Sequence, residues 1–177
     1  MKKDSYFKEL VLRLITGFAV LIGYPLFYMI LAPITLHVSY FFFNIFMPSA
    51  LVGTKIVTVM DSFELIPACV ATSAYLLLAI LILLTKDISP SERFQMFVYG
   101  SLAILAFNIL RIELLLLTYF SLNTAYDSLH LFVWKFMSTA FVVLLWLGLA
   151  RLYKVKAIPV YSDLRHIISM IKMSRKK

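Results

Sequence analysis

The sequence predicts an all-α integral membrane protein, a helical bundle of about five transmembrane segments. Three observations predict this class: 62% of the 177 residues are hydrophobic, only 15% are charged, and the mean hydropathy is +0.92. A soluble domain builds its core with far less apolar sequence. Apolar runs of about 20 residues, the length that crosses a hydrocarbon layer of about 30 Å, occupy residues 10–31, 34–52, 66–85, 94–118 and 130–150.

The first run is too long for the hydrophobic part of a cleavable signal peptide, so we expect it to stay in the membrane. The second run is the weakest, because it is interrupted by His37, Ser39 and Asn44. Between the second and third runs, residues 54–64 are rich in β-branched side chains and predict a short extracytoplasmic flap, either a hairpin or an extended segment. We expect residues 1–177 to form a single integral domain.

The net charge of +8 is concentrated at the C-terminal end, in a basic tail of residues 151–177. A basic segment beside a membrane span is typical of a topogenic signal or of contact with anionic lipid, so we predict a cytoplasmic C-terminus and no nucleic-acid partner. Ser162 is a candidate N-cap for a short surface helix that carries Leu164, Ile168 and Ile171 at helical spacing.

Counting back from a cytoplasmic C-terminus places residues 123–129 and 53–65 outside and residues 86–93 inside. Five spans would then put the N-terminus outside, whereas Lys2, Lys3, Lys8 and Arg13 favour the inside. The side of the N-terminus therefore stays open at this point.

Three residues that could perform covalent chemistry, Cys69, Arg111 and His130, are predicted to lie near the same extracytoplasmic face. Cys69 and Arg111 stand equally far in sequence from Pro90 in the inner turn, so they match in depth at about 1.5 Å per residue. His130 opens the last run, just after an outer loop. A thiolate needs an acid or base to manage protons, and a tetrahedral oxyanion needs a positively charged donor. The three residue types together supply these roles.

Each residue also has a structural interpretation. Cys69 suits a small buried position, Arg111 could extend to the headgroups, and His130 could be an interfacial histidine. Asn108 shares a helix face with Arg111, and both favour a polar interior surface. Supporting roles for Glu64 and Ser73 are the minor interpretation. One cysteine and three scattered histidines form no metal-ligand cluster, so we predict no metal and no cofactor.

The ordered set of motifs resembles the exosortase and archaeosortase family of multi-pass cysteine transpeptidases. The resemblance covers roughly residues 34–152. It is carried by Gly53 after an apolar run, residues 64–69 (ELIPAC), Arg93 in the inner loop, residues 108–112 (NILRI), and His130 at the opening of the last run.

This resemblance implies a compact member of the family with Cys69 as the nucleophile, Arg111 as the basic partner and His130 as the third residue of a catalytic triad. Its partners would be exported proteins with a C-terminal transmembrane sorting signal, cut through a thioester on Cys69 and transferred to a membrane lipid or another surface acceptor. The protein would then be a multi-pass protein of the cell membrane. The alternative is a non-enzymatic membrane protein, a transporter component or assembly factor, with a polar cavity at Arg111 and His130.

Overall fold

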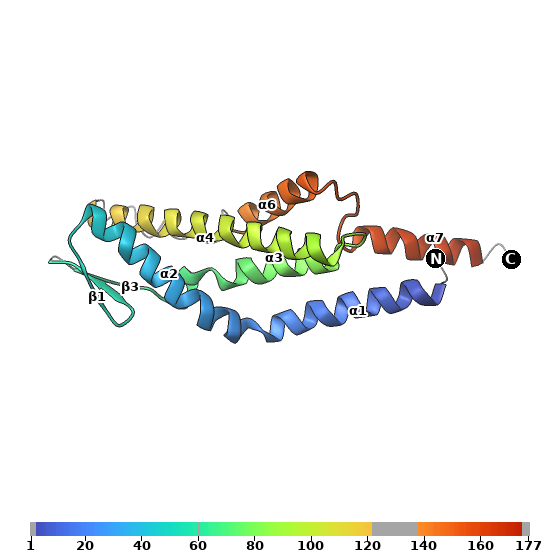
Figure 1. Ribbon diagram of the computed structural model, residues 1–177, viewed down its shortest axis with the longest axis horizontal. Helices are drawn as coiled ribbons and strands as arrows, with labels where there is room; N and C mark the ends of the chain where they lie inside the picture. The colour runs from blue at the N-terminus through green and yellow to red at the C-terminus, as the bar shows by residue number, and fades with distance from the viewer. Residues whose placement is uncertain (1–2, 60, 122–137, 175–177) are drawn as a thin grey trace.

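The computed structural model describes residues 3–59, 61–121 and 138–174, which are mostly helical (Figure 1). The helices are α1 (Lys3–Ile22), α2 (Tyr24–Phe46), α3 (Thr72–Leu84), α4 (Pro90–Ser121), α6 (Ser138–Leu152) and α7 (Tyr161–Ser174). A 3-10 helix, η1 (Pro67–Val70), precedes α3, and three short strands lie between α2 and η1: β1 (Ala50–Val52), β2 (Lys55–Val57) and β3 (Ser62–Glu64).

The first two helices divide at a different place from the one predicted. The sequence favoured a break between residues 31 and 34, whereas α1 ends at Ile22 and α2 begins at Tyr24. Gly23 stands at the junction, and Pro25 occupies the first turn of α2, where a missing N–H costs nothing. Pro33 lies inside α2, which continues through it. The prediction of spans 10–31 and 34–52 was therefore wrong at both inner boundaries.

The predicted flap is a three-stranded antiparallel sheet in the order β1-β2-β3. The second apolar run leaves the helical state at Phe46, and residues 50–52 form β1 instead. Pro48 explains the change, because a proline disfavours the helical conformation in the residue before it; Met47 is indeed extended. The sheet packs against the helices through Ile56 of β2, which is fully buried in a cluster with Phe43 of α2 and Ile112 of α4.

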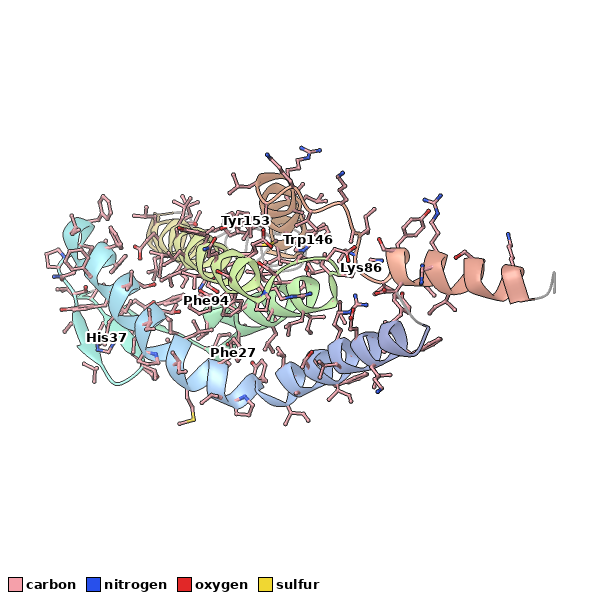
Figure 2. The ribbon with its side chains drawn as sticks, turned by 45° about the vertical axis from the view of Figure 1, so that its right-hand side comes forward. Phe27, His37, Lys86, Phe94, Trp146 and Tyr153 are labelled. Carbon is pink, nitrogen blue, oxygen red and sulfur yellow. The ribbon has the colours of Figure 1, made fainter. Side chains whose placement is uncertain are left out.

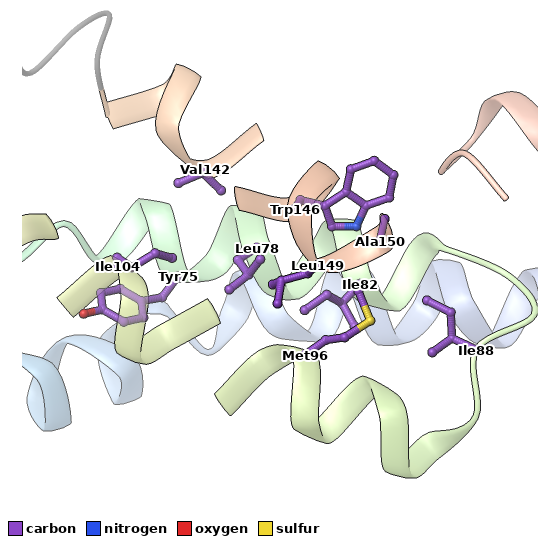
Figure 3. Close-up of a cluster of buried hydrophobic side chains, with 10 residues drawn as sticks. All are labelled: Tyr75, Leu78, Ile82, Ile88, Met96, Ile104, Val142, Trp146, Leu149 and Ala150. Carbon is purple, nitrogen blue, oxygen red and sulfur yellow. The ribbon is translucent and has the colours of Figure 1, made fainter. Parts of the chain in front are cut away.

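The main hydrophobic core joins α3, α4 and α6 (Figure 3). Tyr75, Leu78 and Ile82 of α3 meet Met96 and Ile104 of α4 and a row from α6 that comprises Val142, Trp146, Leu149 and Ala150. Gly100 makes this close packing possible, because a Cβ atom there would lie 2.5 Å from Leu78 Cδ2. Small residues let helices approach closely in this way.

Arg93 closes the C-terminal end of α3. Its guanidinium donates hydrogen bonds to the carbonyl oxygens of Ile82 (2.6 Å), Leu83 (2.9 Å) and Thr85 (2.7 Å), and its Nε donates to Ile88 (3.2 Å). The last carbonyls of a helix have no partner within the helix, and Arg93 supplies one from the start of α4. The sequence analysis named Arg93 only as part of the family resemblance and did not predict these hydrogen bonds.

A buried polar cluster joins the two ends of the chain. Asp163 of α7 accepts hydrogen bonds from both terminal nitrogens of Arg13 (3.1 Å each) and from the Tyr6 hydroxyl (2.7 Å). Burial, followed by the hydrogen bond to Asp163, raises the pKa of Tyr6 to about 12, so this phenol remains a neutral donor. The predicted tail helix is present as α7, and Ser162 lies in its first turn. Lys86 lies where α1, the end of α3 and α7 meet (Figure 2).

The helices run between two ends of an elongated bundle. In Figure 1, α1 and α2 proceed in the same general direction, from the end that carries α7 to the end that carries the β-sheet. From there α3 returns, α4 runs out again, and α6 returns. The beginning of α1 and the whole of α7 therefore lie at the same end, where Asp163 holds Tyr6 and Arg13.

Among the described residues, two helices are long and apolar enough to cross a membrane: α2, and α4 over Pro90–Thr118. The apolar helices α3 and α6 have 13 and 15 residues. Five separate spans are thus more than the helix lengths support.

Candidate functional site

Cys69 lies on the 3-10 turn that leads into α3. The turn η1 begins with Pro67, and it is joined to α3 by Ala71, whose backbone is in the left-handed region (φ 57°). The Cys69 N–H donates to the Ile66 carbonyl oxygen at 2.8 Å. Because η1 and α3 do not form one continuous helix, the Cys69 and Ala68 carbonyls remain available to side chains from elsewhere.

Two side chains of α4 bind these carbonyls. Asn108 Nδ2 donates to the Cys69 carbonyl oxygen at 2.8 Å, and Arg111 Nη2 donates to the oxygens of Ala68 (3.3 Å) and Cys69 (3.2 Å). Asn108 and Arg111 are three residues apart and so share one face of α4, as predicted. Both are buried, with 2% and 6% of their surfaces exposed. A buried arginine is therefore held against the backbone of the candidate nucleophile.

The Cys69 side chain lies in a different environment from its carbonyl. It is 5% exposed and belongs to an apolar cluster with Phe43 of α2, Ile56 and Leu65 of the β-sheet region, and Ile112 and Leu116 of α4. The β-sheet therefore contributes to covering the thiol.

A cavity of about 530 Å³ lies next to Arg111, between α3, α4 and α6. Its polar lining includes Arg111, Thr72, Ser73 and Thr139, and Pro67 and Ala68 of the 3-10 turn also border it. The hydroxyl of Thr72 is buried and has no hydrogen-bond partner within the described residues. Such a cavity can take a ligand with a carbonyl or an anionic oxygen for Arg111 and an acceptor or donor for Thr72.

The fates of the predicted site residues differ. Cys69, Arg111 and Asn108 are brought together, and Ser73 borders the cavity beside them. Glu64 is on β3, where its exposed carboxylate pairs with Lys55 at 3.5 Å, which is a structural role in the sheet. His130 lies outside the described residues.

Two of the buried polar residues that the sequence analysis did not single out, Thr72 and Glu113, lie near Arg111. Thr72 was inconspicuous because threonine is common in membrane helices. Glu113 is an acidic residue inside an apolar run, which is a signal that could have been noticed. In the part of the chain that the structure describes, no three potential metal ligands come together.

Comparison of the chain with protein-family models, curated proteins and solved structures gives no match.

Proposed function

We propose that this protein is a membrane-embedded cysteine protease or transpeptidase that cleaves C-terminal sorting signals of exported, membrane-anchored proteins. The observation that carries the proposal is the hydrogen-bonded unit of Cys69, Asn108 and Arg111 beside a polar cavity. An arginine inside an apolar run costs about 2.5 to 3.5 kcal/mol at the bilayer centre on insertion scales, and less toward the headgroups. A helix retains such a residue most readily where its charge is used.

The chemistry would proceed in two steps. The Cys69 thiolate attacks the scissile carbonyl carbon, the C–N bond breaks, and the leaving amine takes a proton, which leaves a thioester on Sγ. An amine or hydroxyl of a lipid or another surface acceptor then attacks the thioester, and the C–S bond breaks to restore the thiol. In this scheme Arg111 stabilises the oxyanion of each tetrahedral intermediate, and His130 transfers the protons.

Access to the thiol requires movement of the β-sheet. Cys69 is packed against Ile56 and Leu65, so a substrate carbonyl reaches Sγ only after these side chains withdraw. The sheet is short, with three residues in each strand, and short strands hold few ladder hydrogen bonds. A flap of this kind would exclude water until the substrate is bound.

The membrane topology that fits this proposal has four crossings. The helices α1 and α2 together make the first passage and α4 makes a full-length crossing. The helices α3 and α6, with 13 and 15 residues, make two short crossings, which a locally thinner bilayer accommodates. The basic tail favours a cytoplasmic α7, and the hydrogen bonds from Tyr6 and Arg13 to Asp163 favour the same side for the start of α1. Cys69 and Arg111 then face the extracytoplasmic side, where exported substrates are found. This topology removes the conflict between the number of spans and the N-terminal lysines.

The decisive experiment is co-expression with an exported test protein that carries a C-terminal membrane anchor. We expect wild type to shorten the test protein and both Cys69→Ala and Cys69→Ser to leave it intact, because a serine hydroxyl stays protonated without a strong base. Arg111→Lys keeps the charge, loses the planar fork of donors, and should be severely impaired. Equal membrane insertion of each variant is checked by immunoblot.

Full processing by well-expressed Cys69→Ala would refute the transpeptidase proposal. His130→Ala should slow the reaction by about 10² to 10⁴, the usual effect of removing an acid-base group. Processing of the test protein by cells that lack this chain is the background control.

A second candidate is a non-enzymatic membrane protein that binds a ligand in the polar cavity. It is favoured by one observation: Arg111 borders the cavity, whereas the Cys69 side chain is among apolar residues. For such a protein, Cys69→Ala should behave as wild type in a growth or transport assay, while Arg111→Gln should fail.

A further inference from the structure

An open groove of about 500 Å³ runs between α2 and α4. Its walls are apolar, with Phe42 and Phe46 from α2 and Leu102, Ile109 and Leu117 from α4, and Glu113 is the one charged residue that borders it among the described residues. Pockets of about 300 to 1,000 Å³ with apolar walls and a few placed polar groups are typical of small-ligand sites.

Glu113 is the unusual feature of this groove. Its surface is only 9% exposed, and both carboxyl oxygens are buried without a hydrogen-bond partner in the described structure. Burial of a carboxyl group without a hydrogen-bond donor is strongly unfavourable. A donor from outside the chain would remove this cost. The closest chemical complement to a carboxylate is an ammonium group.

The groove is separate from the site at Cys69. Glu113 follows Arg111 by two residues, which places the two side chains on nearly opposite faces of α4, since successive residues are about 100° apart. Arg111 faces α3 and the 3-10 turn, while Glu113 faces the groove along α2. Ligand binding in this groove is therefore independent of the cysteine chemistry and shares with the proposed function only the four-crossing topology.

The outer rim of the groove is apolar and exposed. Leu102, Leu110 and Leu114 are each more than half exposed, and all lie within the part of α4 that is long and apolar enough to cross a membrane. Along α4, the distance from Glu113 to Leu102 is about 16 Å at 1.5 Å per residue. A groove of this length can hold much of an extended acyl chain. A transmembrane helix, with a diameter of about 10 to 12 Å, would need a wider trough.

We propose that the groove between α2 and α4 binds a membrane phospholipid whose headgroup carries a primary amine. The ammonium group donates a hydrogen bond to the Glu113 carboxylate, and one acyl chain lies along the groove toward Leu102. Glu113 and Arg111 lie at nearly the same depth in the membrane, since they are two residues apart on α4. The four-crossing topology puts this depth close to the outer headgroups. The lipid ammonium group can therefore reach the carboxylate from its usual position in the bilayer.

The test is native mass spectrometry of the purified full-length protein supplied with dioleoyl phosphatidylethanolamine, phosphatidylcholine or phosphatidylglycerol. A charge-assisted hydrogen bond predicts that the ethanolamine lipid is retained at least about ten-fold better than the other two. Choline is cationic but has no N–H, and glycerol has hydroxyls but no positive charge. Equal retention of all three lipids, or a preference for the choline or glycerol lipid, would overturn the proposal.

Two variants tie the result to this groove. Glu113→Gln should reduce the preference to less than about two-fold while leaving thermal unfolding unchanged or improved, because the amide has the same shape without the charge. Glu9→Gln, the same change at an exposed position of α1, should keep the full preference. Ala106→Trp, which fills the groove, should lower retention of all three lipids. A Glu113→Gln protein that still selects ethanolamine would place the lipid elsewhere and refute the assignment.

Discussion

At the scale of single residues, the Cys69 carbonyl is bound by two donors that stand one turn apart on α4, Asn108 Nδ2 and Arg111 Nη2. These hydrogen bonds fix the turn that carries the cysteine, while its side chain is packed in the apolar cluster with Phe43 and Ile56. Asn108 and Arg111 therefore position the backbone of the candidate nucleophile, whatever further role Arg111 has with a substrate.

We predict that Asn108→Leu destabilises the protein by about 1 to 3 kcal/mol, because it removes a buried hydrogen bond and leaves the Cys69 carbonyl less well satisfied. The measurement is thermal unfolding in detergent. Leu110→Ala, an exposed position on the same helix, should change stability by less than about 0.5 kcal/mol. An Asn108→Leu protein as stable as wild type would show that the hydrogen bond contributes little to the turn.

At the scale of elements, the C-terminal end of α3 is completed by Arg93 at the start of α4. A planar guanidinium reaches the Ile82, Leu83 and Thr85 carbonyls at the same time, which a lysine ammonium on a flexible stem cannot do with the same geometry. The short turn between α3 and α4 is thus held by side-chain hydrogen bonds as well as by the core.

We predict that Arg93→Lys loosens this turn although it preserves the charge. Hydrogen exchange of peptides that cover residues 80–95 should accelerate at least several-fold, because the freed carbonyls open the last turn of α3. Arg151→Lys, an exposed arginine in the last turn of α6, is the matched control and should leave exchange unchanged. Wild-type exchange in Arg93→Lys would contradict the role given to the guanidinium.

At the scale of the whole molecule, a hydrogen-bonded cluster connects the first helix, α1, to the last described helix, α7. Asp163 binds Arg13 through two hydrogen bonds and Tyr6 through a third, and these partners are separated by 150 residues or more of sequence. These charge-assisted hydrogen bonds connect α1 to α7 at the same end of the bundle.

We predict that both ends face the cytoplasm and that the β-sheet faces outward. In a Cys69→Ser background, Val59→Cys, which lies at a fully exposed position, should react with a membrane-impermeant maleimide in intact cells. Lys8→Cys and Lys172→Cys should react only after permeabilisation. Labelling of Lys8→Cys from outside, with Lys172→Cys still protected, would restore an odd number of crossings.

The sequence by itself determined the helical class, the apolar character of the chain, the flap before the third apolar run and the proximity of Cys69 to Arg111. These follow from composition, from β-branched residues at 54–64 and from the symmetric spacing about the inner turn, all of which are local or one-dimensional properties.

Only the tertiary structure decided how the apolar runs are used. The first helix ends next to Gly23 and Pro25, whereas Pro33 does not interrupt α2. The local cost of a proline can be read from the sequence, but the packing that outweighs this cost cannot. The rotation of α4 about its axis decides that Arg111 meets the Cys69 carbonyl and that Glu113 is buried beside α2. Hydrophobic periodicity cannot reveal this rotation, because in the longest helices both the buried and the outward faces are apolar.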